Sequence, residues 1–154
     1  MTTRRNATRF GFAALAVVAA ATITGCGMMS PASNQLVFTT QLSATNEVPP
    51  NSSQASGSVD AVLNKDTNLL RWKVKYTGLT GPATAGHFHG PAVAGANAGV
   101  ALPWPGVMST PSEGSATLTA AQAADLMAGR WYANVHTAAN PGGEIRGQMT
   151  AVRN

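Results

Sequence analysis

The sequence predicts an all-β domain: an antiparallel Greek-key β-sandwich or barrel of about seven or eight strands with one short helix. The first observation is that short runs of alternating apolar and polar residues recur from residue 35 onward. The second is that clusters of Gly, Pro, Asn, Asp and Ser separate these runs at intervals of roughly 8–12 residues. The third is that residues 120–128 are the only helical run between them. Short strands joined by tight turns favour antiparallel pairing.

Each alternating run is interpreted as one strand. The clearest is the run over residues 70–76, in which apolar side chains alternate with three cationic ones. The predicted strands cover residues 36–42, 57–63, 70–76, 83–89, 114–118 and 131–136, with a short strand around 100–102 and a final one from 144 to 152. Thr119 and Gln122 form a capping-box pattern ahead of the helix, and Gly129 ends it.

The N-terminal segment has the pattern of an export signal. Three arginines and no acid stand in the first nine residues, and residues 10–23 are an unbroken small and apolar run. This run of about 14 residues is shorter than the roughly 20 that a membrane-spanning helix needs. Ile23-Thr24-Gly25-Cys26 resembles a bacterial lipobox, in which the cysteine receives diacylglycerol and becomes the new N-terminus. The other interpretation is a buried free cysteine beside an ordinary cleavage site.

The predicted organisation follows from that processing. Residues 1–25 are expected to be a lipoprotein signal peptide, residues 26–34 a lipidated tether, and residues 35–154 one folded domain. A lipid on Cys26 would hold the domain at a membrane surface, so we expect an exported, lipid-anchored protein of the bacterial cell envelope, periplasmic or on the outer surface. Cys26 is the single cysteine, so we expect the domain to be stabilised by its core, without disulfides.

The charge of the chain argues against nucleic-acid binding. The full sequence has ten basic and six acidic residues, and three of the basic ones fall in the predicted signal peptide. The seven basic residues that remain nearly balance the acids. A nearly neutral domain lacks the electrostatic footprint of a protein that binds DNA or RNA.

The histidines are the candidate functional residues. His87 and His89 alternate on one predicted strand, so their imidazoles leave the same face while Phe88 points toward the core. His136, at the end of another predicted strand, would supply a third nitrogen. Imidazole suits copper, zinc, iron or nickel, so the pattern predicts a metal site of His87, His89 and His136. The alternative is that each histidine is an ordinary hydrogen-bonding residue at a strand end.

Polar residues on the neighbouring predicted strands are expected to orient these histidines. Asn134 shares a face with His136, and Glu144 and Arg146 share one face of the last predicted strand. Two interpretations of Glu144 and Arg146 stay open. They form a surface ion pair, or they contact a metal-ligating histidine and fix its orientation.

Three segments of the sequence resemble the CHRD domain. They are Leu42-Ser-Ala-Thr-Asn-Glu-Val-Pro-Pro, then Ala85-Gly-His-Phe-His-Gly-Pro, then the long run from Gly129-Arg-Trp-Tyr-Ala-Asn-Val-His-Thr to Pro-Gly-Gly-Glu-Ile-Arg-Gly-Gln. The resemblance covers about residues 35–150. The family is named from chordin, an extracellular antagonist of growth factors, and also occurs in exported bacterial proteins. It implies an immunoglobulin-like or dismutase-like sandwich.

The order of His87, His89, His136 and Arg146 is also similar to that in copper/zinc superoxide dismutases. Those enzymes place an H-x-H pair on one strand, another copper-ligating histidine later, and an arginine near the copper. The sequence departs from them, since it has no further histidine for the metal-bridging position, no zinc-loop ligand set and no disulfide cysteines. The likeness implies a copper site, with zinc as the alternative, and favours metal binding over dismutation.

The sequence is therefore compatible with three functions. The first is metal binding or handling at the cell envelope by the three histidines, with no catalytic residues. The second is an extracytoplasmic structural or interaction domain, in which the loop over residues 91–105 meets an envelope protein. The third is a dismutase-like copper enzyme with Arg146 steering an anion. Hydrolysis by a Ser/His/Asp set is not supported, because the few acids are scattered through turns.

Overall fold

The computed structural model describes residues 34–106 and 109–152. Its strands are β1 (Gln35–Ser43), β2 (Ser56–Asn64), β3 (Leu69–Thr77), β4 (Ala83–His89), β5 (Val100–Pro103), β6 (Ser112–Thr117), β7 (Tyr132–Thr137), β8 (Ile145–Gln148) and β9 (Thr150–Ala151). The helical elements are a 3-10 turn, η1 (Ala44–Asn46), and α1 (Ala120–Met127). The predicted signal peptide, the predicted lipidation site at Cys26 and almost all of the predicted tether lie outside the described residues. No helix of the described ranges is long and apolar enough to cross a membrane.

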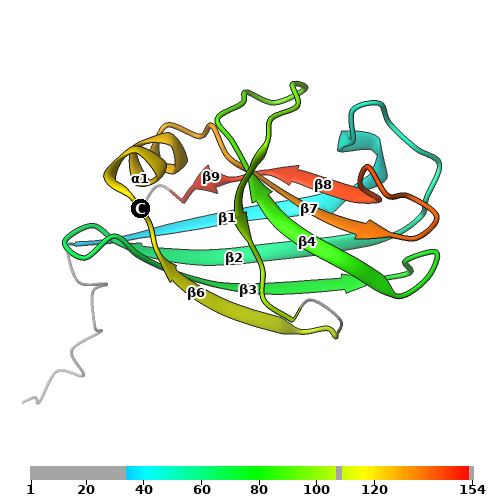
Figure 1. Cartoon of the computed structure of the whole chain (residues 1–154), viewed down its shortest axis with the longest axis horizontal. Helices are drawn as coiled ribbons and strands as arrows, with labels where there is room; N and C mark the ends of the chain where they lie inside the picture. Colours follow the sequence, from blue (N-terminus) through cyan, green and yellow to red (C-terminus); the bar gives the residue numbers. More distant parts are fainter. Residues whose placement is uncertain (1–33, 107–108, 153–154) are drawn as a thin grey trace, which may run out of the picture.

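The nine strands of the described residues form one antiparallel sheet. Its order is β5-β4-β7-β8-β1-β2-β3-β6, and the short β9 pairs with β1. Figure 1 shows this sheet curled into a half-barrel with α1 lying at one end. The predicted all-β antiparallel class with one short α-helix is confirmed. Because the sheet is continuous, the fold is better described as a partly closed barrel than as a sandwich of two separate sheets.

The apolar core lies inside the curl of the sheet, because alternation turns every second side chain of a strand to that face. Phe88, the second-last residue of β4, is fully buried there. Its ring meets three tryptophans, with centroid distances of 5.4 Å to Trp72, 5.0 Å to Trp104 and 5.7 Å to Trp131. These aromatic contacts anchor β4 to the core and turn the histidines beside Phe88 to the opposite face of the sheet.

Local sequence signals place the turns and the helix as predicted. The Asn64 side chain accepts hydrogen bonds from the backbone N–H groups of Asp66 and Thr67, which closes the β2–β3 hairpin. At the start of α1, Thr119 Oγ1 accepts from the Gln122 N–H, and Gln122 Oε1 accepts from the Thr119 N–H. This reciprocal pair is the predicted capping box.

The last predicted strand is divided in the structure. Instead of running from residue 144 to 152, it forms β8 and β9 with Met149 between them. Met149 is fully buried in the core, and its N–H donates to Trp131 O at 2.9 Å. The side chain of Met149 enters the core at this break. β8 lies between β7 and β1, whereas β9 pairs with β1, so one sequence run becomes two strands.

Candidate metal centre

The three histidines meet because β4 and β7 are neighbours in the sheet. The register pairs His89 with Tyr132, His87 with Asn134 and Ala85 with His136. His87 and His136 are therefore diagonal neighbours on one face of an antiparallel pair, a separation that long side chains bridge. The predicted convergence of the H-x-H pair with a histidine from a neighbouring strand is what the fold produces.

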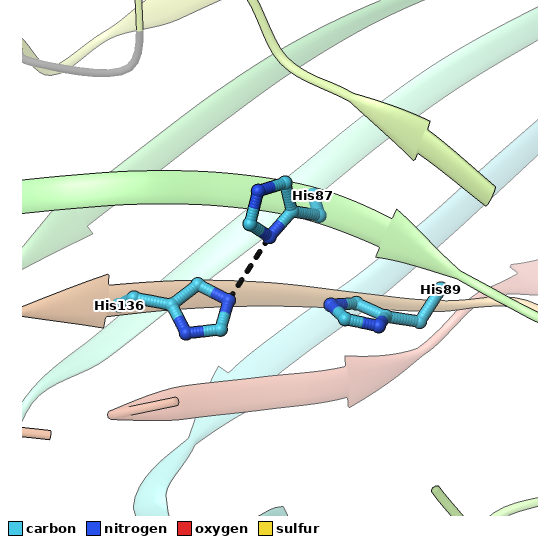
Figure 2. Close-up of side chains that lie close together, drawn as sticks. All are labelled: His87, His89 and His136. Atoms are coloured by element: carbon cyan, nitrogen blue, oxygen red, sulfur yellow. Dashed lines mark hydrogen bonds between the residues drawn. The ribbon is translucent and has the colours of Figure 1, made fainter. Parts of the chain in front are cut away.

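Figure 2 shows the His87 and His136 rings turned toward each other, with His89 beside them. His87 Nδ1 lies 3.0 Å from His136 Nε2. The ring centroids lie 4.9 Å apart for His87 and His136, 5.5 Å for His87 and His89, and 6.1 Å for His89 and His136. One ligand nitrogen from each ring falls within 4.8 Å of the others. In the described residues, no other group of three His, Cys, Asp or Glu side chains is arranged in this way.

A close backbone approach fixes the end of β4. A Cβ on Gly90 would lie 2.5 Å from Trp131 Cδ1 and 2.9 Å from the Arg130 carbonyl oxygen. Only glycine fits this position without displacing the neighbouring backbone. The chain can therefore pass close to Trp131 directly after His89, which sets the place of the second histidine relative to β7.

Backbone carbonyls determine which histidine nitrogens are free to bind a metal. His89 Nδ1 lies 3.0 Å from Ala98 O, and His136 Nδ1 lies 3.0 Å from Pro141 O. A carbonyl oxygen only accepts, so both Nδ1 atoms carry the proton and both Nε2 atoms present a lone pair. His87 Nδ1 therefore donates to His136 Nε2. Ligation through the same atom of His87 requires its proton to move to Nε2.

The electrostatics of the centre keep all three imidazoles neutral at neutral pH. Burial is the main cause that lowers the pKa of His87, and its two histidine neighbours lower it further. Burial also lowers the pKa of His89, an effect that the bond to Ala98 opposes and that His136 and Arg146 reinforce. Burial lowers the pKa of His136 against the opposing bond to Pro141. Neutral imidazole is the form that ligates metals.

The donor set fits one transition-metal ion. Three nitrogens bound at about 2.0–2.1 Å to one ion lie roughly 3.5 Å apart, so the His87–His136 pair has to open slightly and His89 to approach. His89 Nε2 is buried and has no hydrogen-bond partner in the described residues. Such an unpartnered buried polar atom is costly, and an ion between the rings would satisfy it. The three histidines would hold the ion, which would supply a Lewis-acidic or redox-active centre there.

Comparison with known families identifies the domain. The sequence profile of the CHRD domain matches residues 38–149, more than half of the chain. The chain belongs to the CHRD domain family. Comparisons with curated proteins and with solved structures find no match. The matched range includes all three histidines and every strand that carries them.

In this CHRD domain, Tyr132 and Arg146 form a stacked column against the ring of His89. The Tyr132 ring lies parallel to the His89 ring, with centroids 4.8 Å apart and an interplanar angle of 3°. On Tyr132 lies the guanidinium of Arg146, whose Cζ is 3.4 Å from the ring centroid. Arg146 is 2 % exposed, although arginine is normally a surface residue. The column links the buried cation to the metal centre through one aromatic ring.

The loop between β4 and β5 is held against this column. Arg146 Nη1 donates to Asn97 Oδ1 at 2.8 Å and Nη2 donates to Ala96 O at 2.5 Å. Tyr132 Oη donates to Ala98 O at 3.3 Å and accepts from the Ala98 N–H at 3.2 Å. Because Ala98 O also accepts from His89, Arg146 and Tyr132 together fix the carbonyl that sets the orientation of His89.

Asn134 and Glu144 contact other groups than the histidines. Asn134 Nδ2 donates to Glu47 Oε1 at 2.8 Å, and Glu144 is fully buried. Glu144 accepts from Ser53, from Thr137 and from both the N–H and the hydroxyl of Thr80. The surface ion pair of Glu144 with Arg146, one of the two interpretations left open by the sequence, is not formed. Both side chains are buried, and each is bound by a different set of neutral partners.

Sequence reasoning missed three components of the centre. They are the stacked Tyr132 ring and the carbonyls of Ala98 and Pro141. Tyr132 alternates with Asn134 and His136, so its face was readable from the sequence, but its register against His89 was not. A backbone carbonyl has no sequence signature at all, because every residue carries one.

Proposed function

We propose that this CHRD domain binds a transition-metal ion, copper in the first place and zinc as the alternative, through His87, His89 and His136. The observation that carries the proposal is the buried, unpartnered Nε2 of His89 beside two further histidine nitrogens. Three neutral imidazoles match the preferences of copper and zinc, and a nitrogen-donor site follows the order of affinities that puts Cu²⁺ first among the divalent ions.

The proposal extends to where the domain acts. An exported protein tethered by lipid on Cys26 would present the centre at the cell envelope, where it would bind or hand on metal. The basic segment, apolar run and lipobox-like residues at the N-terminus support this location. Mass spectrometry of the membrane-extracted protein tests it. We expect loss of residues 1–25 and a diacylglycerol adduct, and we expect Cys26→Ser to abolish the adduct. An unmodified Cys26 would contradict the anchor.

The metal itself is tested by titration of the full chain, purified in mild detergent, with copper and zinc against a chromophoric competitor. The variant His87→Ala/His89→Ala removes two of the three nitrogens and is expected to lose binding by at least a hundredfold. Thr84→Ala is the matched control, since Thr84 is an exposed residue of the same strand. Equal, weak binding by the wild type and the double variant would refute the metal centre. The interaction function would then remain. It is tested by asking whether the wild type and the double variant capture the same protein partner equally.

A further inference from the structure

Arg146 is a buried cation without an acidic partner at hydrogen-bond distance. In residues 34–106 and 109–152 the ion pairs are Lys73 with Glu113 and Arg130 with Asp125. The side-chain bonds of Arg146 go to Ala96 O and Asn97 Oδ1, both neutral. No ion pair neutralises its positive charge. The carboxylate of Glu47 opposes this charge without forming an ion pair, and buried surroundings let a charge act more strongly than water does.

The charge lies close to the histidine centre. Tyr132 separates the guanidinium from His89, with 3.4 Å to the Tyr132 centroid on one side and 4.8 Å between ring centroids on the other. No water layer fits within a stack of that spacing. The field of Arg146 reaches the centre through an aromatic ring and not through solvent, so salt screens it only weakly.

The ligand set offers no compensating negative charge. The cluster consists of three imidazoles, which are neutral when they ligate, and the described residues place no carboxylate or thiolate within it. A divalent ion in such a centre keeps its whole charge beside a buried cation, whereas a monovalent ion is repelled half as strongly. On the basis of the proposed metal function, we infer that Arg146 biases the three-histidine centre toward Cu⁺ over Cu²⁺, as its specificity-determining residue.

The size of the effect follows from Coulomb's law. At a separation of roughly 10 Å and an effective dielectric constant of about 20, one unit charge changes the ratio of Cu⁺ to Cu²⁺ affinity by about tenfold. For a one-electron couple, a tenfold change corresponds to about 59 mV in reduction potential. Removal of the cation strengthens Cu²⁺ binding more than Cu⁺ binding, so the potential falls.

The experiment measures the Cu⁺ and Cu²⁺ affinities of the full chain by competition with a chelator for each oxidation state, and the reduction potential of the copper-loaded protein. Arg146→Gln is expected to lower the affinity ratio about tenfold and the potential by about 59 mV. Arg146→Lys keeps the charge and is expected to remain within threefold of wild type. Arg71→Gln removes an exposed cation from β3 and serves as the control, with no change expected.

The outcomes distinguish the effect of the Arg146 charge on copper binding from the effect of a change in the loop geometry. Loosening of the Ala96–Ala98 loop would weaken both oxidation states together, so it moves the affinities but not their ratio. An unchanged ratio in Arg146→Gln, or the same fall in Arg146→Lys, overturns the inference while the metal function stands. Absence of copper binding by the wild type overturns both.

A second variant covers failure of Arg146→Gln to fold. Glu47 lines the same cleft as Arg146, a cavity of about 420 Å³, and its carboxylate opposes the charge of Arg146. Glu47→Gln, measured at pH 8.5, removes that opposition and is expected to raise the ratio of Cu⁺ to Cu²⁺ affinity above the wild-type value. A fall in the ratio, or no change, overturns the inference.

Discussion

Tyr132 lies flat on His89, with ring centroids 4.8 Å apart and planes within 3° of parallel. The same tyrosine donates its hydroxyl hydrogen to Ala98 O, the carbonyl that also accepts from His89 Nδ1. Stacking and the shared carbonyl therefore fix one histidine of the centre in two ways, and they are separable by mutation.

The stack is expected to matter more than the hydroxyl. Tyr132→Leu removes the aromatic surface and is expected to weaken copper binding by roughly tenfold or more, as loss of a residue that orients a ligand does elsewhere. Tyr132→Phe keeps the ring and is expected to stay within about threefold of wild type. Competition titration with a chromophoric chelator measures both. Equal losses in the two variants would show that the hydroxyl, not the stack, orients His89.

Gly143 is expected to tolerate no side chain. Its φ is +134°, and a Cβ there would overlap Asn134 Nδ2 and Glu47 Oε1, two groups bonded to each other beside the centre. Gly143→Ala is expected to lower the free energy of unfolding by about 2–4 kcal/mol, through backbone strain and the broken hydrogen bond. Gly142→Ala is the matched control, because a Cβ at Gly142 meets no atom within 4 Å. Urea denaturation compares the two, and equal stabilities would contradict the overlap.

Glu144 is expected to stabilise the fold as an ionised group. Burial raises its pKa, but hydrogen bonds from Ser53, Thr137 and Thr80 outweigh this and lower the pKa to about 2. A carboxyl whose pKa is lower in the folded chain contributes stability above its ordinary pKa of 4.5 and loses it as the pH falls toward 2. Glu144→Gln replaces one carboxylate oxygen by an amide NH₂ group, which cannot accept the hydrogen bonds that this oxygen receives. We expect it to cost about 2–3 kcal/mol at pH 7.

The control for Glu144 is Glu113→Gln, which removes an exposed acid paired with Lys73. An exposed pair contributes little, so urea denaturation at pH 7 is expected to give the same midpoint as wild type. If Glu144→Gln matched that control, the four hydrogen bonds would not be a source of stability.

Glu47 is expected to titrate near neutral pH with the opposite sign. Burial raises its pKa to about 7, and Arg146 and the backbone N–H of Val48 offset part of this. A carboxyl whose folded pKa exceeds its unfolded value of 4.5 favours folding when protonated, so its contribution to stability decreases as the pH rises from 4.5 to about 7. Glu47→Gln fixes the neutral form and keeps an oxygen for Asn134. We expect a higher Tm than wild type at pH 8.5 and an equal one at pH 4.5. A wild-type advantage at pH 8.5 would contradict the raised pKa.

The sequence alone determined the faces of the strands. Alternation placed His87 and His89 together and Phe88 opposite them, and the same period put Tyr132, Asn134 and His136 on one face. The capping pattern of Thr119 and the hairpin composition after Asn64 marked element ends correctly, because these signals act between residues close in the chain.

The tertiary structure decided what those faces meet. The pairing of β4 with β7 rests on strands more than forty residues apart, and no local pattern specifies such a partner. The burial of Glu144 and Arg146 depends in the same way on loops that fold over them from Ser53, Thr80 and Asn97. The carbonyls of Ala98 and Pro141 fix the histidine tautomers through backbone atoms that are chemically alike in every residue. Alternation therefore supplies the candidate ligands, while long-range register and backbone position make them a centre.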